Sequence, residues 1–219
     1  MRMDEVDSTY NKPKTSLDSE HNAMLAPAKL DLHVIGLGHG GSMSLKYIHD
    51  KGYKAKYTTI NEHRLKNVEG SEIDFIPFVP PRYLFRTRPN GEPVDHSQMD
   101  KPLVIPDEVI NLFEKGHFYV LLAALGGYTG TLMMEGLSRM LIDRQEKFLG
   151  ICSIPFSFEG RLRESYAKAT VKEFGLYQNF RWFELDDLLD RYKDLRLGEA
   201  YTRASEEFCL IFEEYFSSI

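Results

Sequence analysis

Residues 126–131, Gly-Gly-Tyr-Thr-Gly-Thr, constrain the fold of this chain more than any other stretch. They follow an apolar run over residues 118–125, which has the length and composition of a strand buried on both faces. They precede residues 132–144, where apolar side chains recur at helical spacing. Glycine lets the backbone approach a ligand closely, and a helix start offers unpaired amide hydrogens. The stretch therefore predicts a strand, a loop and a helix that form either a phosphate site or a ligand-free turn.

A second glycine loop lies earlier in the chain, over residues 36–43 (Gly-Leu-Gly-His-Gly-Gly-Ser-Met). It stands between a predicted strand, residues 30–35, and a predicted helix, residues 42–51. Its glycine spacing fits the G-x-G-x-x-G pattern of dinucleotide-binding loops. Glu62, after the next predicted strand, stands where such a fold carries the acidic ligand of the ribose. An NAD-binding oxidoreductase of the Rossmann type is therefore one interpretation.

The rest of the chain continues the alternation of strands and helices. Further strands are expected over residues 73–79, where Pro77 indicates an edge, and over Phe148–Ile154 and residues 180–185. Further helices are expected over residues 106–114, Arg161–Phe174, a short segment after Asp186, and residues 199–216. This order predicts an α/β fold with a doubly wound, mostly parallel sheet. Ligands of such sheets bind beyond the carboxyl ends of the strands, where both glycine loops converge.

Composition limits the partners and the compartment. The net charge of -6 argues against bare nucleic acid as the main partner. No apolar run approaches 18 residues and the N-terminus has no signal-peptide core, so we expect no membrane contact and a cytoplasmic location. Cys152 and Cys209 lie in apolar contexts that favour buried free thiols. The polar residues 1–28 predict a flexible arm, and residues 29–219 predict one domain.

Three motifs together resemble those of one family. Residues 36–42, residues 126–131 and the segment Pro-Phe-Ser-Phe-Glu-Gly-Arg at 155–161 occur in the order and at the approximate spacing of the FtsZ/tubulin family. The resemblance covers residues 30–219, the nucleotide-binding half of the family fold. It implies GTP or GDP as ligand, with Mg²⁺. The nucleotide-binding residues that it implies are Gly36, Gly38, His39, Gly40, Gly41, Ser42, Asn61, Gly126, Gly127, Tyr128, Thr129, Gly130, Thr131, Glu159, Arg163 and Tyr201.

The same resemblance implies a role for each part of the site. Residues 38–42 would wrap the diphosphate, residues 126–131 would hold the terminal phosphates, and Asn61 would border the site. Glu159 would bind the ribose hydroxyls with Arg163 beside it, and Tyr201 would stack on the guanine. The residues themselves show no Ser/His/Asp or Cys/His arrangement for catalysis and no metal-ligand spacing, so no catalytic side chain and no protein ligand for a metal is predicted. The chain also lacks the G-x-x-x-x-G-K-S/T sequence of a Walker site.

Several positions depart from the family pattern. Leu185 and Ser205 stand where the family carries groups that contact the base, and Met43 replaces an asparagine of the first loop. Phosphate and ribose contacts are therefore better preserved than base contacts. Tyr128 replaces a glycine, and it either caps the phosphate, narrows the site or blocks a triphosphate. His39 either contacts phosphate or faces solvent. Arg82, Arg86 and Arg88, in the insertion over residues 80–107, either face phosphate or form a solvated basic loop.

The resulting expectation is a guanine-nucleotide-binding protein that lacks the family's activation domain and acts in an assembly. A protein partner or a second copy would bind through the nucleotide face or the C-terminal helix. In the family, a loop after that helix positions the attacking water, and here the chain stops at Ile219. Weak or absent hydrolysis by the chain alone is therefore expected, with an exposed apolar patch at Phe208, Phe212, Tyr215 and Phe216. The alternative is a catalytically silent structural module.

Overall fold

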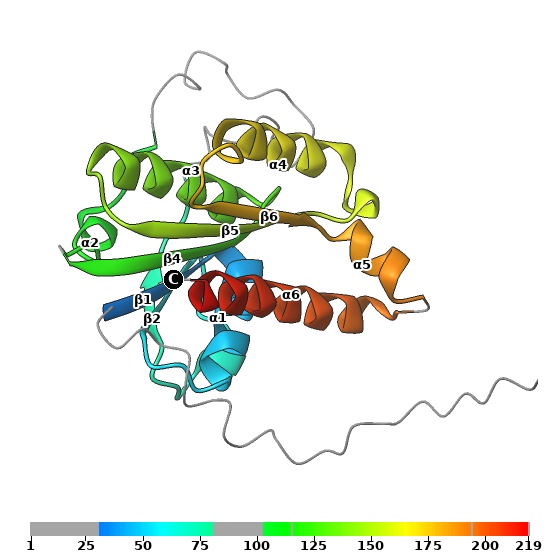
Figure 1. Ribbon diagram of the computed structural model, residues 1–219, viewed down its shortest axis with the longest axis horizontal. Helices are drawn as coiled ribbons and strands as arrows, with labels where there is room; N and C mark the ends of the chain where they lie inside the picture. The colour runs from blue at the N-terminus through cyan, green and yellow to red at the C-terminus, as the bar shows by residue number, and fades with distance from the viewer. Residues whose placement is uncertain (1–30, 81–102, 115, 194, 219) are drawn as a thin grey trace, which may run out of the picture.

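The computed structural model describes residues 31–80, 103–114, 116–193 and 195–218. They form a six-stranded sheet in the order β3-β2-β1-β4-β5-β6, with every neighbouring pair parallel and helices on both faces (Figure 1). This confirms the doubly wound α/β class. Parallel strands need crossovers that cover both faces, so the central strands are apolar along their whole length. β4 (His117–Ala124) illustrates this, since its six inner residues are all buried.

The remaining elements follow the predicted alternation. The other strands are β1 (Asp31–Leu37), β2 (Lys56–Asn61), β3 (Asp74–Pro77), β5 (Phe148–Ile154) and β6 (Phe180–Glu184). The α-helices are α1 (Gly38–Asp50), α2 (Asp107–Ile110), α3 (Tyr128–Asp143), α4 (Arg161–Phe174), α5 (Asp186–Arg191) and α6 (Leu197–Ser217). Two short 3-10 turns are η2 (Lys66–Val68) and η5 (Ser157–Glu159). The predicted bounds of β5 and α4 are confirmed, and β3 is an edge strand as Pro77 indicated.

Two apolar cores lie on opposite faces of the sheet. On one face α3 and α4 pack against strand residues such as Ile35 and Leu121. On the other face α1 and α6 pack against the alternate residues, such as Val34 and Val120. Figure 1 shows the two helical layers separated by the sheet. Neighbouring residues of one strand therefore belong to different cores, and the sheet lies between the two.

Two helices begin four residues earlier than predicted. α1 starts at Gly38 rather than at residue 42, and α3 starts at Tyr128 rather than at residue 132. Glycine is unfavourable in a helix interior, so helical periodicity alone places these helix starts after the glycines. In the structure the first turns contain these glycines because they pack on strands. A Cβ at Gly41, for example, would lie 2.1 Å from the carbonyl oxygen of Leu122.

The apolar stripe of α6 is covered. Phe208, Phe212 and Phe216 are each at most 6% exposed and pack on the sheet, and Tyr215 is half-buried with its ring centroid 5.9 Å from that of Phe118. The prediction of an exposed patch was wrong, because the sheet itself supplies the surface that the stripe needs. The predicted arm and the arginines at 82, 86 and 88 lie outside the described residues. No helix in the described ranges is long and apolar enough to cross a membrane.

Candidate functional site

The site lies where the chain leaves two neighbouring strands in opposite directions. β1 and β4 are adjacent and parallel, yet β1 leads into α1 on one face and β4 leads into α3 on the other. Such a switch point leaves a crevice outside the carboxyl ends of the strands. α1 begins directly after β1, and α3 begins after the three-residue connection 125–127. Both helix N-termini, with their unpaired amides and positive dipole ends, therefore reach the same edge of the sheet.

The glycines of the two loops pack against each other and against the strands. Gly38 has a φ of +68°, and a Cβ there would lie 2.8 Å from the amide nitrogen of Gly130. A Cβ at Gly40 would lie 2.4 Å from the Cβ of Ala124. Gly127 differs, because nothing lies within 4 Å of a Cβ built on it. The other three glycines allow close packing, whereas Gly127 faces open space.

Five of the predicted residues do not line the cavity: Gly36, Gly41, Ser42, Gly126 and Thr131. They shape the loops instead. A Cβ at Gly36 would lie 2.7 Å from the carbonyl oxygen of Gly41. Ser42 Oγ donates to the carbonyl oxygen of Gly38 at 2.7 Å, and the amide of Gly126 donates to Thr131 Oγ1 at 2.9 Å. Any direct contact of these five residues with a ligand stays a prediction.

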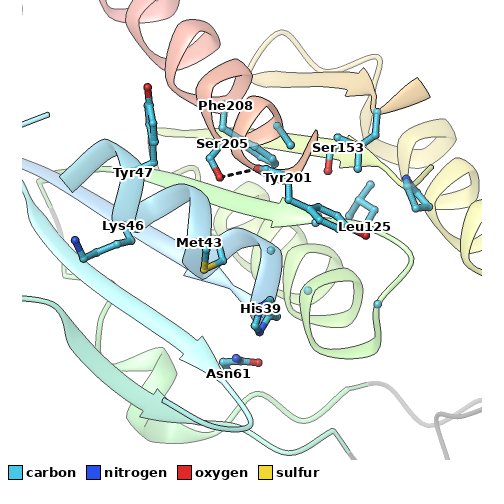
Figure 2. A pocket seen from close by; sticks show the side chains of 18 of the residues that line it. His39, Met43, Lys46, Tyr47, Asn61, Leu125, Ser153, Tyr201, Ser205 and Phe208 are labelled. Carbon is cyan, nitrogen blue, oxygen red and sulfur yellow. Dashed lines mark hydrogen bonds between the residues drawn. The ribbon is translucent and has the colours of Figure 1, made fainter. Parts of the chain in front are cut away.

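The cavity has a volume of about 860 Å³, within the range of small-molecule sites. It is bordered by the whole length of α1, by the starts of α3 and α4, and by the first half of α6; Figure 2 shows side chains that line it. The predicted residues that line it are Gly38, His39, Gly40, Asn61, Gly127, Tyr128, Thr129, Gly130, Glu159, Arg163 and Tyr201. Segments from four parts of the chain therefore meet here. Asn61 is held by its own loop, since its side-chain amide donates to the carbonyl oxygen of His63 at 3.1 Å.

Glu159 connects three elements at one side of the cavity. Its Oε1 accepts from the amide of Phe156 at 3.2 Å, and its Oε2 accepts from Arg163 Nη1 at 2.6 Å. Burial raises the pKa of the Tyr201 phenol, and the adjacent Glu159 carboxylate raises it further. The carboxylate thus has the structural role of closing the turn η5, and it also faces the cavity.

Ser153 is a site residue that the sequence did not reveal. It lines the cavity from the end of β5, is 1% exposed, and its Oγ has no hydrogen-bond partner (Figure 2). A buried hydroxyl without a partner is unfavourable unless a ligand or water completes it. In the sequence, Ser153 is one small residue within an apolar strand and looks like core. Its position at the carboxyl end of a parallel strand was the available signal.

The carboxylates of Glu62 and Asp186, which each follow a strand, lie outside the cavity lining. Glu62 has a side chain that is 53% exposed and lies 3.8 Å from His63 Nε2, so it does not face the crevice as a Rossmann ribose ligand would. Asp186 is the first residue of α5, and its carboxylate accepts from the amide of Ser157 at the start of η5, at 3.1 Å. Within the described ranges no group of three or more His, Cys, Asp or Glu side chains could hold a metal ion.

Comparisons with known proteins agree with this geometry. No protein-family model matches the chain. A mitochondrial division protein of Dictyostelium discoideum, fszB, is 21% identical over 210 residues, which cover 92% of this chain and 55% of that protein. The structure of an empty FtsZ dimer from M. jannaschii has a TM-score of 0.65 at 15% identity, covering 91% of this chain and 58% of that one. GDP-bound monomeric CetZ1 from Haloferax volcanii has a TM-score of 0.60 at 18% identity, covering 87% and 61%.

This chain spans a little over half the length of these relatives. The strand order alone would also fit a classical dinucleotide-binding fold. The structural matches decide between the two, because they cover most of this chain and are FtsZ-like proteins. The resemblance drawn from the three sequence motifs is thereby confirmed, and the chain has the fold of the FtsZ/tubulin nucleotide-binding domain.

Proposed function

We propose that this chain binds a guanine nucleotide, GTP or GDP, in the cavity between α1, α3, α4 and α6. The observation that carries the proposal is the meeting of two glycine-containing helix starts at one cavity of about 860 Å³. Helix N-termini bind phosphate through backbone amides and the dipole. The two lysine and arginine side chains that line the cavity already have carboxylate partners, since Lys46 is paired with Asp50 and Arg163 with Glu159. Phosphate binding in this cavity would therefore depend on the backbone amides. Among relatives of the same fold, the CetZ1 structure contains GDP.

The described residues fit such a ligand. Gly127 leaves open space where a phosphate would approach the backbone, and the Ser153 hydroxyl is buried without a partner. Residues 38–40 and 127–130 would hold the phosphates. Glu159 would accept from the ribose hydroxyls, and Tyr201 would pack against the base.

We include Mg²⁺ in the proposal, as a partner of the nucleotide phosphates. Mg²⁺ in nucleotide sites usually keeps several waters and few protein ligands. Thr129 and Asn61 line the cavity and offer side-chain oxygen atoms beside the two loops. The ion would neutralise phosphate charge when bound. Titration with GTP in Mg²⁺ and then in EDTA tests this, and equal affinities would remove Mg²⁺ from the proposal.

We further propose that the chain acts in an assembly through its nucleotide face. Of the two surfaces expected to bind a partner, the apolar face of α6 already packs on the sheet. The nucleotide face is therefore the favoured surface for association. The FtsZ relative of M. jannaschii is described as a dimer. Sedimentation velocity with GTP, with GDP and without nucleotide measures this association. A monomer under all three conditions, at concentrations up to about 100 µM, would contradict it. A cytoplasmic location and weak or absent stand-alone hydrolysis stay predictions.

The deciding experiment identifies the nucleotide. The purified chain is denatured, released nucleotide is analysed by chromatography, and GDP binding to the emptied protein is measured by calorimetry. Released guanine nucleotide, or GDP binding that Gly127→Val removes, supports the proposal. Absence of both would favour the alternative of a catalytically silent structural module. A nicotinamide cofactor would contradict both.

A further inference from the structure

We propose that the cavity holds its base by stacking and apolar contact, so that it discriminates only weakly between guanine and adenine. This inference rests on the proposed nucleotide function and adds the selectivity of the same site. It concerns the part of the cavity between α1 and α6, beyond the two glycine loops. If the phosphates occupy the loops and the ribose lies by Glu159, the base must enter this part.

Aromatic and apolar side chains dominate that part of the cavity. Met43 and Tyr47 line it from α1, Tyr201 and Phe208 from α6, and Leu185 from the start of α5. Figure 2 shows Tyr47 and Met43 on the helix that faces Tyr201, Ser205 and Phe208. Stacking and dispersion against such side chains are largely independent of the base, because every base has a π-face.

The neutral polar side chains of this part do not separate the two purines. Besides the phenol groups of Tyr47 and Tyr201, they are Ser205 and Thr202 on α6 and Asn67 on η2. The Oγ of Ser205 donates to the carbonyl oxygen of Tyr201 at 3.3 Å, and Thr202 Oγ1 donates to that of Gly198 at 3.2 Å. Hydroxyls both donate and accept, and a carboxamide can rotate to present either group. Guanine offers donors at N1 and N2 and adenine offers a donor at N6, so these side chains can pair with either base.

Groups of fixed sign would discriminate, but those lining the cavity are paired with each other. Asp50, an acceptor only, receives hydrogen bonds from Lys46, and this pairing lowers the pKa of its carboxyl group. Glu159 is paired with Arg163 in the same way. The backbone groups of α1 and α6 along this part, beyond the first turn of α6 at Gly198, are used within the helices. Among the described lining residues, no carboxylate is therefore left without a cation to read the two donors of guanine.

The direct test compares GDP with ADP on the intact, nucleotide-free chain by calorimetry. We expect dissociation constants that differ by less than about tenfold, whereas a site built to hydrogen-bond one partner rejects the wrong one by about 10⁴–10⁵. Tight GDP binding with ADP more than about 1,000-fold weaker would overturn this inference and leave the proposed function intact. Failure of both nucleotides to bind would overturn the proposed function and this inference with it.

Variants give a second, constructive test. Thr202→Asp adds a fixed acceptor at an exposed position that lines the cavity, and Ser205→Asp adds one at a buried position. At least one of them should raise the preference for GDP over ADP by about 10-fold or more, as for one added specific polar pair. Thr202→Asn and Ser205→Asn are the matched neutral controls and should leave the ratio unchanged. If neither folded aspartate variant changes the ratio, the base does not lie between α1 and α6 and the inference fails.

The stacking half of the inference has its own variants. Tyr47→Ala should weaken GDP and ADP by the same factor, on the order of 10-fold, because stacking is independent of the base. Tyr177→Ala is the control, since Tyr177 is 46% exposed and does not line the cavity. A loss confined to GDP in Tyr47→Ala would show that the tyrosine reads the base edge, which contradicts base-independent stacking.

Discussion

Gly127→Val separates ligand binding from folding in a single substitution. Gly127 has φ -88° and ψ 154°, which any L residue can adopt, and nothing lies within 4 Å of a Cβ built there. Valine is a poorer helix N-cap than glycine by about 1 kcal/mol, and it restricts the unfolded chain by about 0.4–1 kcal/mol in the opposite sense. The net change in the free energy of unfolding should therefore be within about 1 kcal/mol. That corresponds to a melting temperature within about 2–4 °C of wild type.

The effect on the ligand should be much larger. A phosphate held by the backbone at this position would lose at least one charge-assisted hydrogen bond, worth about 1.5–3 kcal/mol. At 1.4 kcal/mol per tenfold, GDP affinity should fall by about 10- to 150-fold for each such bond. Calorimetry measures the affinity, and differential scanning fluorimetry measures the melting temperature.

Gly41→Ala provides the contrast for this experiment. Its Cβ would lie 2.1 Å from the carbonyl oxygen of Leu122, so backbone must move and the melting temperature should fall clearly. This shows that the fluorimetry detects a damaged loop. A folded Gly127→Val protein that binds GDP with wild-type affinity would refute the argument that phosphates lie on these amides.

Three further predictions address other groups. Glu159→Ala should weaken GDP binding by about 1–3 kcal/mol, and a 2′-deoxy analogue should lose less affinity in the variant than in wild type; equal losses would leave Glu159 only its role in closing η5. Ser153→Ala should leave the melting temperature unchanged or raised, because the hydroxyl has no partner, but should weaken GDP binding by about 0.5–1.5 kcal/mol; unchanged affinity would exclude Ser153 as a ligand contact. Burial, and then nearby Lys56 and His117, lowers the pKa of His33 from 6.5 to about 3, so only the unfolded chain is protonated between these values. The contribution of His33 to the free energy of unfolding is complete above pH 6.5 and falls on acidification by at most about 1.4 kcal/mol per pH unit. Urea unfolding at pH 7, 6 and 5 should therefore show a smaller loss of unfolding free energy in His33→Gln than in wild type. Equal pH dependences in the two proteins would contradict the assignment.

The sequence predicted most elements because their limits are chemically marked. Pro155 ends β5 and Gly160 precedes α4, and both elements have the predicted bounds. The helix starts at Gly38 and Tyr128 were missed because their stability comes from packing on strands that only the tertiary structure brings close. For the same reason the sequence could show that α6 has an apolar stripe but not what covers it.

The sequence motifs predicted where the candidate site lies, but not which of their residues face the cavity. Two glycine loops and Glu159 meet at one cavity, as their positions after parallel strands implied. Periodicity could not tell that Gly41 packs on β4 while Gly127 faces open space, since both are glycines in similar loops. Whether a glycine serves a ligand or a neighbouring strand depends on contacts made by residues far away in the chain.

The close approach of Gly38 to Gly130 also bears on how cooperatively this domain melts. The two apolar layers share the sheet, and here the helix starts of opposite layers touch directly. A nucleotide bonded to both helix starts would join the layers a second time, and its binding free energy would oppose the opening of either one. Amides of α1 and α3 should therefore exchange with solvent more slowly when a nucleotide is bound than when the cavity is empty.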